Sequence, residues 1–312
     1  MQIKEFDTVI LGGGPAGFSA GIYTARGNIS TAIVDVNMLG GQPSNYLELE
    51  NYPAFMKIGG FELMEKFEAH ADMFGVEKFS MQEIESIDLI SSPKVIKTKD
   101  YEFRAKSVII ATGAMPMKLG VKGEAEFLGR GVSYCAVCDG SFYKDKVVAV
   151  VGGGNSALEE AMYLTRFASN VYLIHRRDEL RADKIIQERA MKNEKIEFLW
   201  NSVVSEIQGA ELVNNLVIKN SKTNESSNLK VDGIFPYIGI TPNIKDISGQ
   251  VAQDKSGFIL TDETMKTSVD GVFAVGDVRV TPLRQVITAA SDGAVAGVYA
   301  VKYVESLKEI TV

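Results

Sequence analysis

Short apolar runs that end in glycines or an acidic residue divide the chain into alternating strands and helices. Asp7 to Leu11 is apolar and is followed at once by glycines, which is typical of a buried strand. Small residues continue from Phe18 to Arg26 in a helical pattern, and Thr31 to Val34 predicts the next strand. This strand, helix and strand order favours an α/β fold with a parallel sheet.

The same order recurs in the second half of the chain. Residues 146–151 predict a strand, 155–168 a helix and 171–174 the next strand. Two turn-rich stretches, 116–123 and 241–243, are candidate linkers. The pattern also predicts a helix at 59–75 with Phe61, Met64, Phe67 and Ala71 on its apolar side, strands at 84–89, 94–98, 101–105 and 107–110, hairpins at 201–230 with a loop tip at 224–228, strands at 233–239 and 271–277, and a small-residue helix at 287–304.

The first glycine-rich loop has the full context of a dinucleotide-binding fingerprint. Gly12, Gly14 and Gly17 follow the first strand and open the first helix, with Pro15 and Ala16 between them. Backbone amides at such a helix start can approach a pyrophosphate. Asp35 ends the second strand, about 20 residues after the glycine loop. Its carboxylate can accept hydrogen bonds from ribose hydroxyls there. We therefore predict a dinucleotide site here.

The second glycine-rich loop ends differently. Gly152, Gly154, Asn155 and Ser156 repeat the strand, loop and helix context, but the following strand ends in basic residues, namely His175, Arg176, Arg177 and Arg181. Arginines at this position suit a ribose 2′-phosphate, which they can bind bidentately, whereas a carboxylate would favour a free hydroxyl. We expect NADPH rather than NADH, the alternative being an ordinary solvated basic run.

Between the two loops lie the only two cysteines, Cys135 and Cys138. A zinc site needs about four ligands, and only two histidines could add to the pair, so we expect no metal. A structural disulfide across so short a loop would constrain little of the unfolded chain. A catalytic dithiol remains, and the adjoining Asp139 could move a proton to or from a thiolate, although it could also be a simple turn residue.

Composition limits the partners. The net charge of −7 argues against nucleic acid, which needs a basic face. No apolar run reaches a membrane-spanning length, and the first residues do not form a signal peptide, so we expect a cytoplasmic protein. In that compartment a disulfide is more often catalytic than structural.

Taken in order, the motifs resemble low-molecular-weight, bacterial-type thioredoxin reductases over essentially the whole chain. Gly40, Gly41 and Gln42 form part of the match, although by themselves they would be interpreted as a surface turn. The other matching segments are the two glycine-rich loops, Glu50 to Pro53, Ala111-Thr112-Gly113, Cys135 to Asp139, the His175 to Asp178 run with Arg181, Gly276-Asp277 and Arg284-Gln285.

The resemblance implies two Rossmann-like, three-layer β-β-α domains, one inserted in the other. Residues 1–113 and 241–312 would bind FAD, and residues 114–240 would bind NADPH and carry the cysteines. The implied FAD residues are Gly12, Gly14, Pro15, Ala16, Gly17, Asp35, Gly40, Gly41, Gln42, Asn51, Ala111, Thr112, Gly113, Gly276, Asp277, Arg284, Gln285 and Val286. The implied NADPH residues are Gly152, Gly154, Asn155, Ser156, His175, Arg176, Arg177, Arg181, Ile238 and Gly239.

The resemblance also implies a reaction, namely reduction of a thioredoxin disulfide by NADPH. Cys138 would take electrons from the flavin, and Cys135 would attack the thioredoxin disulfide. A homodimer, and rotation of one domain on the other at the two linkers, are implied as well. Tyr46 and Pro236-Tyr237 depart from the family pattern, and we expect neither to touch the sulfur chemistry.

Other functions stay open from the sequence. A relative could serve a different disulfide protein, such as a glutaredoxin-like or peroxidase-partner protein, or could take electrons from ferredoxin. A ferredoxin-dependent relative would be expected to lose the second glycine loop and its arginines, and this chain keeps both. A non-catalytic flavin-binding redox sensor would have a dithiol that changes state without turnover.

Overall fold

The structure, a computed structural model, describes residues 1–45, 49, 51–134, 136–247 and 249–309, without the side chains of Val137, Cys138, Asp246 and Glu309. The predicted position of Cys135 and the departure at Tyr46 therefore lie outside the described residues. The chain divides into two compact units, Met1–Met115 with Thr241–Val312, and Pro116–Ile240.

The first unit is built on a seven-stranded sheet with the order β3-β2-β1-β6-β5-β4, in which β16 also pairs with β6. The strands β1, β2, β3, β6 and β16 run parallel, whereas β4, β5 and β6 pair antiparallel. The strand bounds are β1 Gln2–Leu11, β2 Thr31–Val34, β3 Glu77–Phe79, β4 Ile84–Asp88, β5 Lys94–Thr98, β6 Tyr101–Ile110 and β16 Val272–Ala274.

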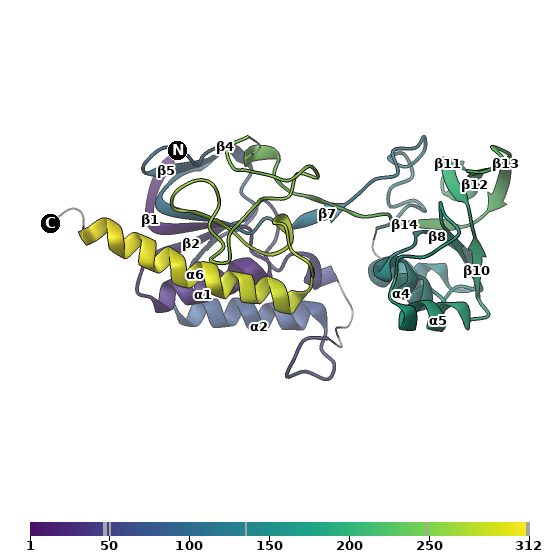
Figure 1. Cartoon of the computed structure of the whole chain (residues 1–312), viewed down its shortest axis with the longest axis horizontal. Coiled ribbons are helices and arrows are strands. Elements are labelled where there is room, and N and C mark those ends of the chain that lie inside the picture. The colour runs from purple at the N-terminus through teal and green to yellow at the C-terminus, as the bar shows by residue number, and fades with distance from the viewer. Residues whose placement is uncertain (46–48, 50, 135, 248, 310–312) are drawn as a thin grey trace. The chain divides into compact units, whose positions relative to one another are not determined.

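Three helices cover one face of this sheet, namely α1 (Pro15–Arg26), α2 (Gly60–Met73) and α6 (Val286–Glu309) (Figure 1). Ile10, Ile33 and Ile109 point from the sheet into the core beneath them. Alternate residues such as Val9 and Val108 point to the opposite face, where a second core is completed by β4, β5 and the segments 244–278. Short 3-10 helices lie at Gln42–Asn45, Lys245–Ile247 and Gly276–Val278.

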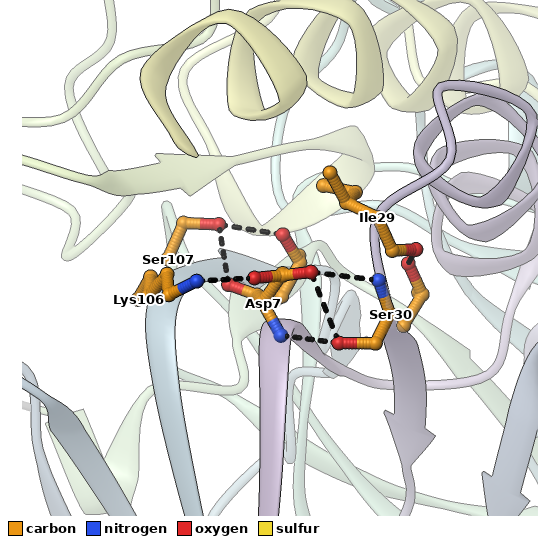
Figure 2. A network of polar contacts seen from close by, with 7 residues as sticks. Asp7, Ile29, Ser30, Lys106 and Ser107 are labelled. Atoms are coloured by element: carbon orange, nitrogen blue, oxygen red, sulfur yellow. Dashed lines mark hydrogen bonds and ion pairs between the residues drawn. The ribbon is translucent and has the colours of Figure 1, made fainter. Parts of the chain in front are cut away.

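Polar contacts around Asp7 join the central strands to one another. Its carboxylate accepts hydrogen bonds from the amide and hydroxyl of Ser30, at 3.0 and 3.1 Å, and lies 2.6 Å from Lys106 Nζ (Figure 2). Burial opposes its charge, but Lys106 and Ser30 outweigh it and lower the pKa of Asp7. The network ties together β1, β2 and β6, whose carboxyl ends carry Gly12, Asp35 and Ala111.

The second unit has a parallel sheet of order β10-β9-β8-β14, with separate cores on its two faces. Its strands are β8 Val147–Gly152, β9 Asn170–Ile174, β10 Ile196–Leu199 and β14 Gly233–Tyr237. One face packs on α3 (Ala136–Asp139), α4 (Asn155–Leu164) and α5 (Lys184–Met191). The other packs on an antiparallel sheet of β11 (Ser202–Gly209), β12 (Val213–Asn220) and β13 (Ser226–Lys230).

Both connections between the units include a short strand. β7 (Ala114–Pro116) and β15 (Ile240–Pro242) pair with each other as a two-stranded sheet. The Oγ1 of Thr112 donates to the carbonyl of Asn243 at 2.7 Å, and the amide of Asn243 donates to Gly113 at 3.0 Å. The two chain crossings are therefore joined to each other.

Several expectations about elements were wrong in detail. The strands expected at 101–105 and 107–110 are one strand, β6, because the polar Lys106 lies on its outward side. Phe61 is 60% exposed and does not join the apolar side of α2. Residues 226–228, expected in a loop tip, begin β13. Residues 184–191, for which the sequence pattern predicted no element, form a helix, α5, in which only Ala190 is buried.

Candidate active site

The first glycine loop is shaped by close approach of backbone to backbone. Gly12 has a φ of +108°, and a Cβ there would clash with the carbonyl oxygen of Ala111. A Cβ on Gly17 would clash with the carbonyl of Gly12. Glycine at both positions lets α1 begin close to the ends of β1 and β6, where the amides of its first turn have no partner within the helix and can bind an anion.

Asp35 and the Gly40-Gly41 turn complete this loop. The amide of Gly13 donates to Asp35 Oδ2 at 2.6 Å, and the amide of Gly40 donates to the carbonyl of Gly13 at 2.8 Å. A Cβ on Gly41 would lie 3.0 Å from Gly14 Cα. Burial raises the pKa of Asp35, although hydrogen bonds from Gly13 and Asn37 oppose the shift. The turn first interpreted as a surface feature therefore packs against the nucleotide loop.

The C-terminal segment returns to the same place. A Cβ on Gly276 would lie 3.1 Å from the Cβ of Ala16, and the amide of Gly276 donates to Asp292 at 3.1 Å. Asn51 Nδ2 donates to Gln285 Oε1 at 2.8 Å. Residues predicted from four distant segments are thus brought together in the first unit, including Asp277, whose pKa is raised by burial.

Two buried polar atoms of the first unit without a hydrogen-bond partner in the described residues are Ser44 Oγ beside the Gly40 turn and Arg284 Nε beside Asp277. Ser44 lies against Gly40, and Arg284 is stacked 4.2 Å from the ring centre of Phe258. A dinucleotide carries the oxygens and nitrogens that such groups would bind. The glycine cradle and these unsatisfied atoms fit FAD, and Ser44 was not identified from the sequence because nothing in its local pattern marks it.

The second glycine loop is enclosed by the segment after β9. The ring of His175 lies directly over Gly153, and the amide of Arg181 donates to the carbonyl of Gly153 at 2.7 Å. Asn155 and Asp183 exchange two hydrogen bonds of 2.7 Å, which fix the start of α4 against that of α5. Beside Gly154, at the start of α4, there is open space around a would-be Cβ. That space and the free helical amides fit a phosphate.

His175 is 4% exposed, and its side chain makes contacts within its own unit. Its Nε2 lies 2.9 Å from the carbonyl of Glu179, which can only accept, so Nε2 carries the proton. Burial, reinforced by Arg181 and Arg176, lowers the pKa of His175, so the ring is neutral at pH 7. By contrast, Arg176, Arg177 and Arg181 are exposed, and their guanidinium groups have no hydrogen-bond or ion-pair partner in the described part of the chain.

The redox segment lies in the second unit as one helical turn, α3, which contains Cys138 and Asp139. Tyr143 follows it, and burial, then the charges of Asp139 and Asp232, raises the pKa of Tyr143 to about 12. Phe142, three residues after Asp139, is 72% exposed. Its exposure could not be inferred from the sequence, because phenylalanine is among the residues most often buried.

Tyr237 corrects one expectation. The amide of Ala136, directly after Cys135, donates to Tyr237 Oη at 2.8 Å. The departure at Tyr237 was expected not to touch the sulfur chemistry, but its hydroxyl lies against the backbone of α3, the turn that carries Cys138. Ile238 and Gly239 follow β14, and the amide of Met117 donates to Gly239 at 2.9 Å.

The structure describes no group of three or more His, Cys, Asp or Glu residues that could hold a metal ion, and among its described helices none has the length and apolarity needed to cross a membrane.

Comparison with known proteins shows which proteins the chain as a whole resembles. Residues 6–293 match the family model for pyridine nucleotide-disulphide oxidoreductases. The chain is 47% identical to the thioredoxin reductase of Bacillus subtilis over 307 residues, covering 98% of this chain and 97% of the relative. A crystal structure of Lactococcus lactis thioredoxin reductase superposes with a TM-score of 0.91 at 46% identity, covering 96% of this chain and 99% of the other.

More distant likeness extends to a ferredoxin-flavin thioredoxin reductase from Clostridium acetobutylicum, at 31% identity and a TM-score of 0.53, covering 98% of this chain and 100% of the other. The resemblance and the fold class predicted from the motifs are confirmed. The chain belongs to the pyridine nucleotide-disulphide oxidoreductase family, within the group formed by the thioredoxin reductases.

Proposed function

We propose that this protein reduces a thioredoxin disulfide with electrons from NADPH, through FAD and the Cys135/Cys138 dithiol. The observation that carries the proposal is the joint presence of two separate nucleotide loops and a Cys-x-x-Cys turn on the second unit, in a chain similar over its full length to thioredoxin reductases. Neither loop would be needed by a protein that merely changed its own thiol state.

The first unit would bind FAD. The amides at the start of α1 and the carboxylate of Asp35 would bind its phosphates and ribose, and Gly276, Asp277, Arg284, Gln285 and Val286 would reach the rest of the molecule. FAD, when bound, supplies a ring that accepts two electrons from a reduced nicotinamide and passes them to a disulfide. The protein residues supply binding and orientation, with Arg284 offering positive charge beside Asp277.

The second unit would bind NADPH. Three unpaired guanidiniums, those of Arg176, Arg177 and Arg181, can surround a 2′-phosphate. Neutral, buried His175 would position them rather than contact the phosphate, because its ring is already packed on Gly153 and bonded to Glu179. This assignment supports NADPH over both NADH and a ferredoxin donor.

The sulfur step follows thiol–disulfide exchange. The Cys135 thiolate attacks one sulfur of the thioredoxin disulfide, and the released thioredoxin thiolate takes a proton. Cys138 then attacks the mixed disulfide, which frees the second thioredoxin thiol and leaves a Cys135–Cys138 disulfide. Asp139 adjoins Cys138 and would supply or accept the proton. Exposed Phe142 offers an apolar contact for the incoming protein.

We further infer a homodimer in the cytoplasm. A reducing compartment would keep the dithiol in its active cycle. The dimer is inferred from the resemblance to thioredoxin reductases. The boundaries near residues 114 and 240, at the paired strands β7 and β15, would separate the FAD part from the NADPH part.

The test is steady-state NADPH oxidation with a thioredoxin disulfide, comparing wild type with Cys138→Ser and Cys135→Ser. Both variants should lose thioredoxin-dependent turnover by at least about 1,000-fold while keeping bound flavin. Turnover that survives in either variant would contradict the dithiol route. Wild-type turnover with a glutaredoxin-like or peroxidase-partner protein, but not thioredoxin, would move the acceptor to that class.

A further inference from the structure

Tyrosine hydroxyls hold the backbone on both sides of Cys135. After it, Ala136 N–H donates to Tyr237 Oη at 2.8 Å. Before it, Tyr134 Oη donates to Glu124 Oε1 at 2.7 Å. Glu124 is itself buried, and its carboxylate also accepts hydrogen bonds from the amides of Leu119 and Gly120, each at 2.7 Å. The redox turn is thus anchored by side chains from two other parts of its unit.

Tyr237 also contacts the second nucleotide loop. It is the last residue of β14, and a Cβ on Gly152 would clash with its carbonyl oxygen. Its ring packs against the core that contains Ala136 and Val150. A single residue therefore joins the glycine loop expected to bind NADPH to the turn that carries the cysteines.

The turn needs such support. α3 is four residues long, far below the length at which a helix is stable without tertiary contacts. Ala136 is its first residue, so its amide has no partner within the helix, and the residue is fully buried. Without the Tyr237 hydroxyl this amide would be a buried, unsatisfied donor, and the turn would have to shift to expose or pair it.

We propose that Tyr237 is a positioning residue for the Cys135/Cys138 couple, an inference that rests on the proposed catalytic role of this dithiol. A disulfide demands a fixed Cβ separation and dihedral angle, whereas two thiols do not. Loosening α3 therefore penalises the disulfide more than the dithiol. Loss of the hydroxyl makes the couple more oxidising, and so a weaker reductant for thioredoxin.

The test is Tyr237→Phe, which removes only the hydroxyl, with Tyr172→Phe on β9 as a matched control whose hydroxyl has no hydrogen bond in the described structure. The holoenzymes are equilibrated in dithiothreitol redox buffers and their thiols trapped by alkylation. Because the chain has only two cysteines, the number of alkyl groups found by mass spectrometry reports the redox state of Cys135 and Cys138 alone.

We expect the Tyr237→Phe equilibrium to shift about tenfold toward the dithiol, which is about 30 mV for a two-electron couple. The kcat/KM for thioredoxin should fall about tenfold, and the rate at which NADPH bleaches the flavin should not change. An unshifted equilibrium would overturn the proposal, and so would an equal loss of bleaching, which would place the effect at Gly152. A wild type inactive with thioredoxin would contradict the proposed function alone, because the alkyl count would still decide the role of Tyr237.

Discussion

At the scale of single residues, the arginine cluster after β9 keeps its charges available. Asp178 adjoins Arg176 and Arg177 in the sequence and could neutralise them, but it lies 2.6 Å from Lys222 instead. Its ion pair with Lys222 lowers the pKa of Asp178. The guanidiniums are therefore left for an anionic ligand, which is the physical basis for preferring a phosphorylated nucleotide.

Replacing Arg176 and Arg177 together by Gln should raise the KM for NADPH by at least about 100-fold, since two charged hydrogen bonds are removed and each is worth roughly 1.5–3 kcal/mol. The KM for NADH should change by less than about threefold, because NADH lacks the 2′-phosphate those bonds would reach. Initial rates with both donors measure this, and exposed Arg189→Gln controls for lost charge. Equal losses for the two donors would contradict the assignment.

Glu160 on α4 shows the opposite condition, a carboxyl without a partner. Its Oε2 is buried with no hydrogen bond among the described residues. Burial, and next the charge of Glu159, raises the pKa of Glu160 to about 7 from its ordinary 4.5. At pH values between 4.5 and about 7, Glu160 of the folded protein keeps a proton that the unfolded chain has released. Stability therefore falls as pH rises through this window, and the penalty is complete above pH 7.

Glu160→Gln should remove that penalty. We expect the variant's Tm to exceed that of wild type by about 2–4 °C at pH 8, for each kcal/mol recovered, and to match it near pH 5. Thermal melts of the holoenzymes at both pH values measure this, with exposed Glu188→Gln as the control. A difference that is the same at both pH values would show that the carboxyl does not titrate in this window.

At the scale of elements, the contact between α1 and α6 joins the two ends of the chain. A Cβ on Gly293 would clash with the carbonyl of Ala16, and one on Gly297 would lie 3.0 Å from the carbonyl of Ala20. The hydroxyl of Ser19 donates to the carbonyl of Ala290 at 2.6 Å. Small residues on α6 let it lie against the very turn of α1 that begins at the nucleotide loop.

Gly293→Ala should destabilise the protein even though alanine favours a helix interior by about 1 kcal/mol. The clash is with backbone, which cannot rotate away, and overpacking of this kind costs about 1–3 kcal/mol. We expect a lower Tm and a lower ratio of FAD to protein after purification, from displacement of α1. Ser291→Ala, at an exposed position of the same helix, should change neither. If Gly293→Ala kept its full flavin content, the contact between α1 and α6 would not be needed for FAD binding.

Much of the element pattern could be predicted from the sequence, because buried parallel strands and glycine loops leave strong local signals. β1 ends just before Gly12 and β8 ends at Gly152, as expected from apolar runs that stop at glycine. α5 could not be predicted in the same way, since a helix with one buried residue has almost no apolar periodicity. The Ala136–Tyr237 bond joins residues 101 apart in the sequence, and no local pattern records such a contact.

At the scale of the whole molecule, the chain is two compact units joined by two crossings that pair with each other. Each unit contains one glycine loop at the carboxyl end of a parallel strand, where ligands of such sheets bind. Because the cysteine turn belongs to the second unit, both the proposed NADPH loop and the dithiol are carried by the inserted segment.

The proposed homodimer has a direct test. Light scattering on the purified holoenzyme should give the mass of two copies of the 34.0 kDa chain, unchanged when the protein is diluted about tenfold. A mass equal to one chain at both concentrations would contradict the dimer, without affecting the reductase proposal.

The measurement that tests the central claim most directly is anaerobic mixing in two steps, followed by the flavin colour. Oxidised holoenzyme is mixed first with NADPH and then with an excess of thioredoxin disulfide. We predict that NADPH bleaches the flavin within seconds, that NADH does so far more slowly, and that thioredoxin restores the colour while its own thiols appear. If NADPH leaves the flavin yellow, or if thioredoxin leaves the bleached enzyme unchanged, the proposed path from nucleotide to thioredoxin is wrong.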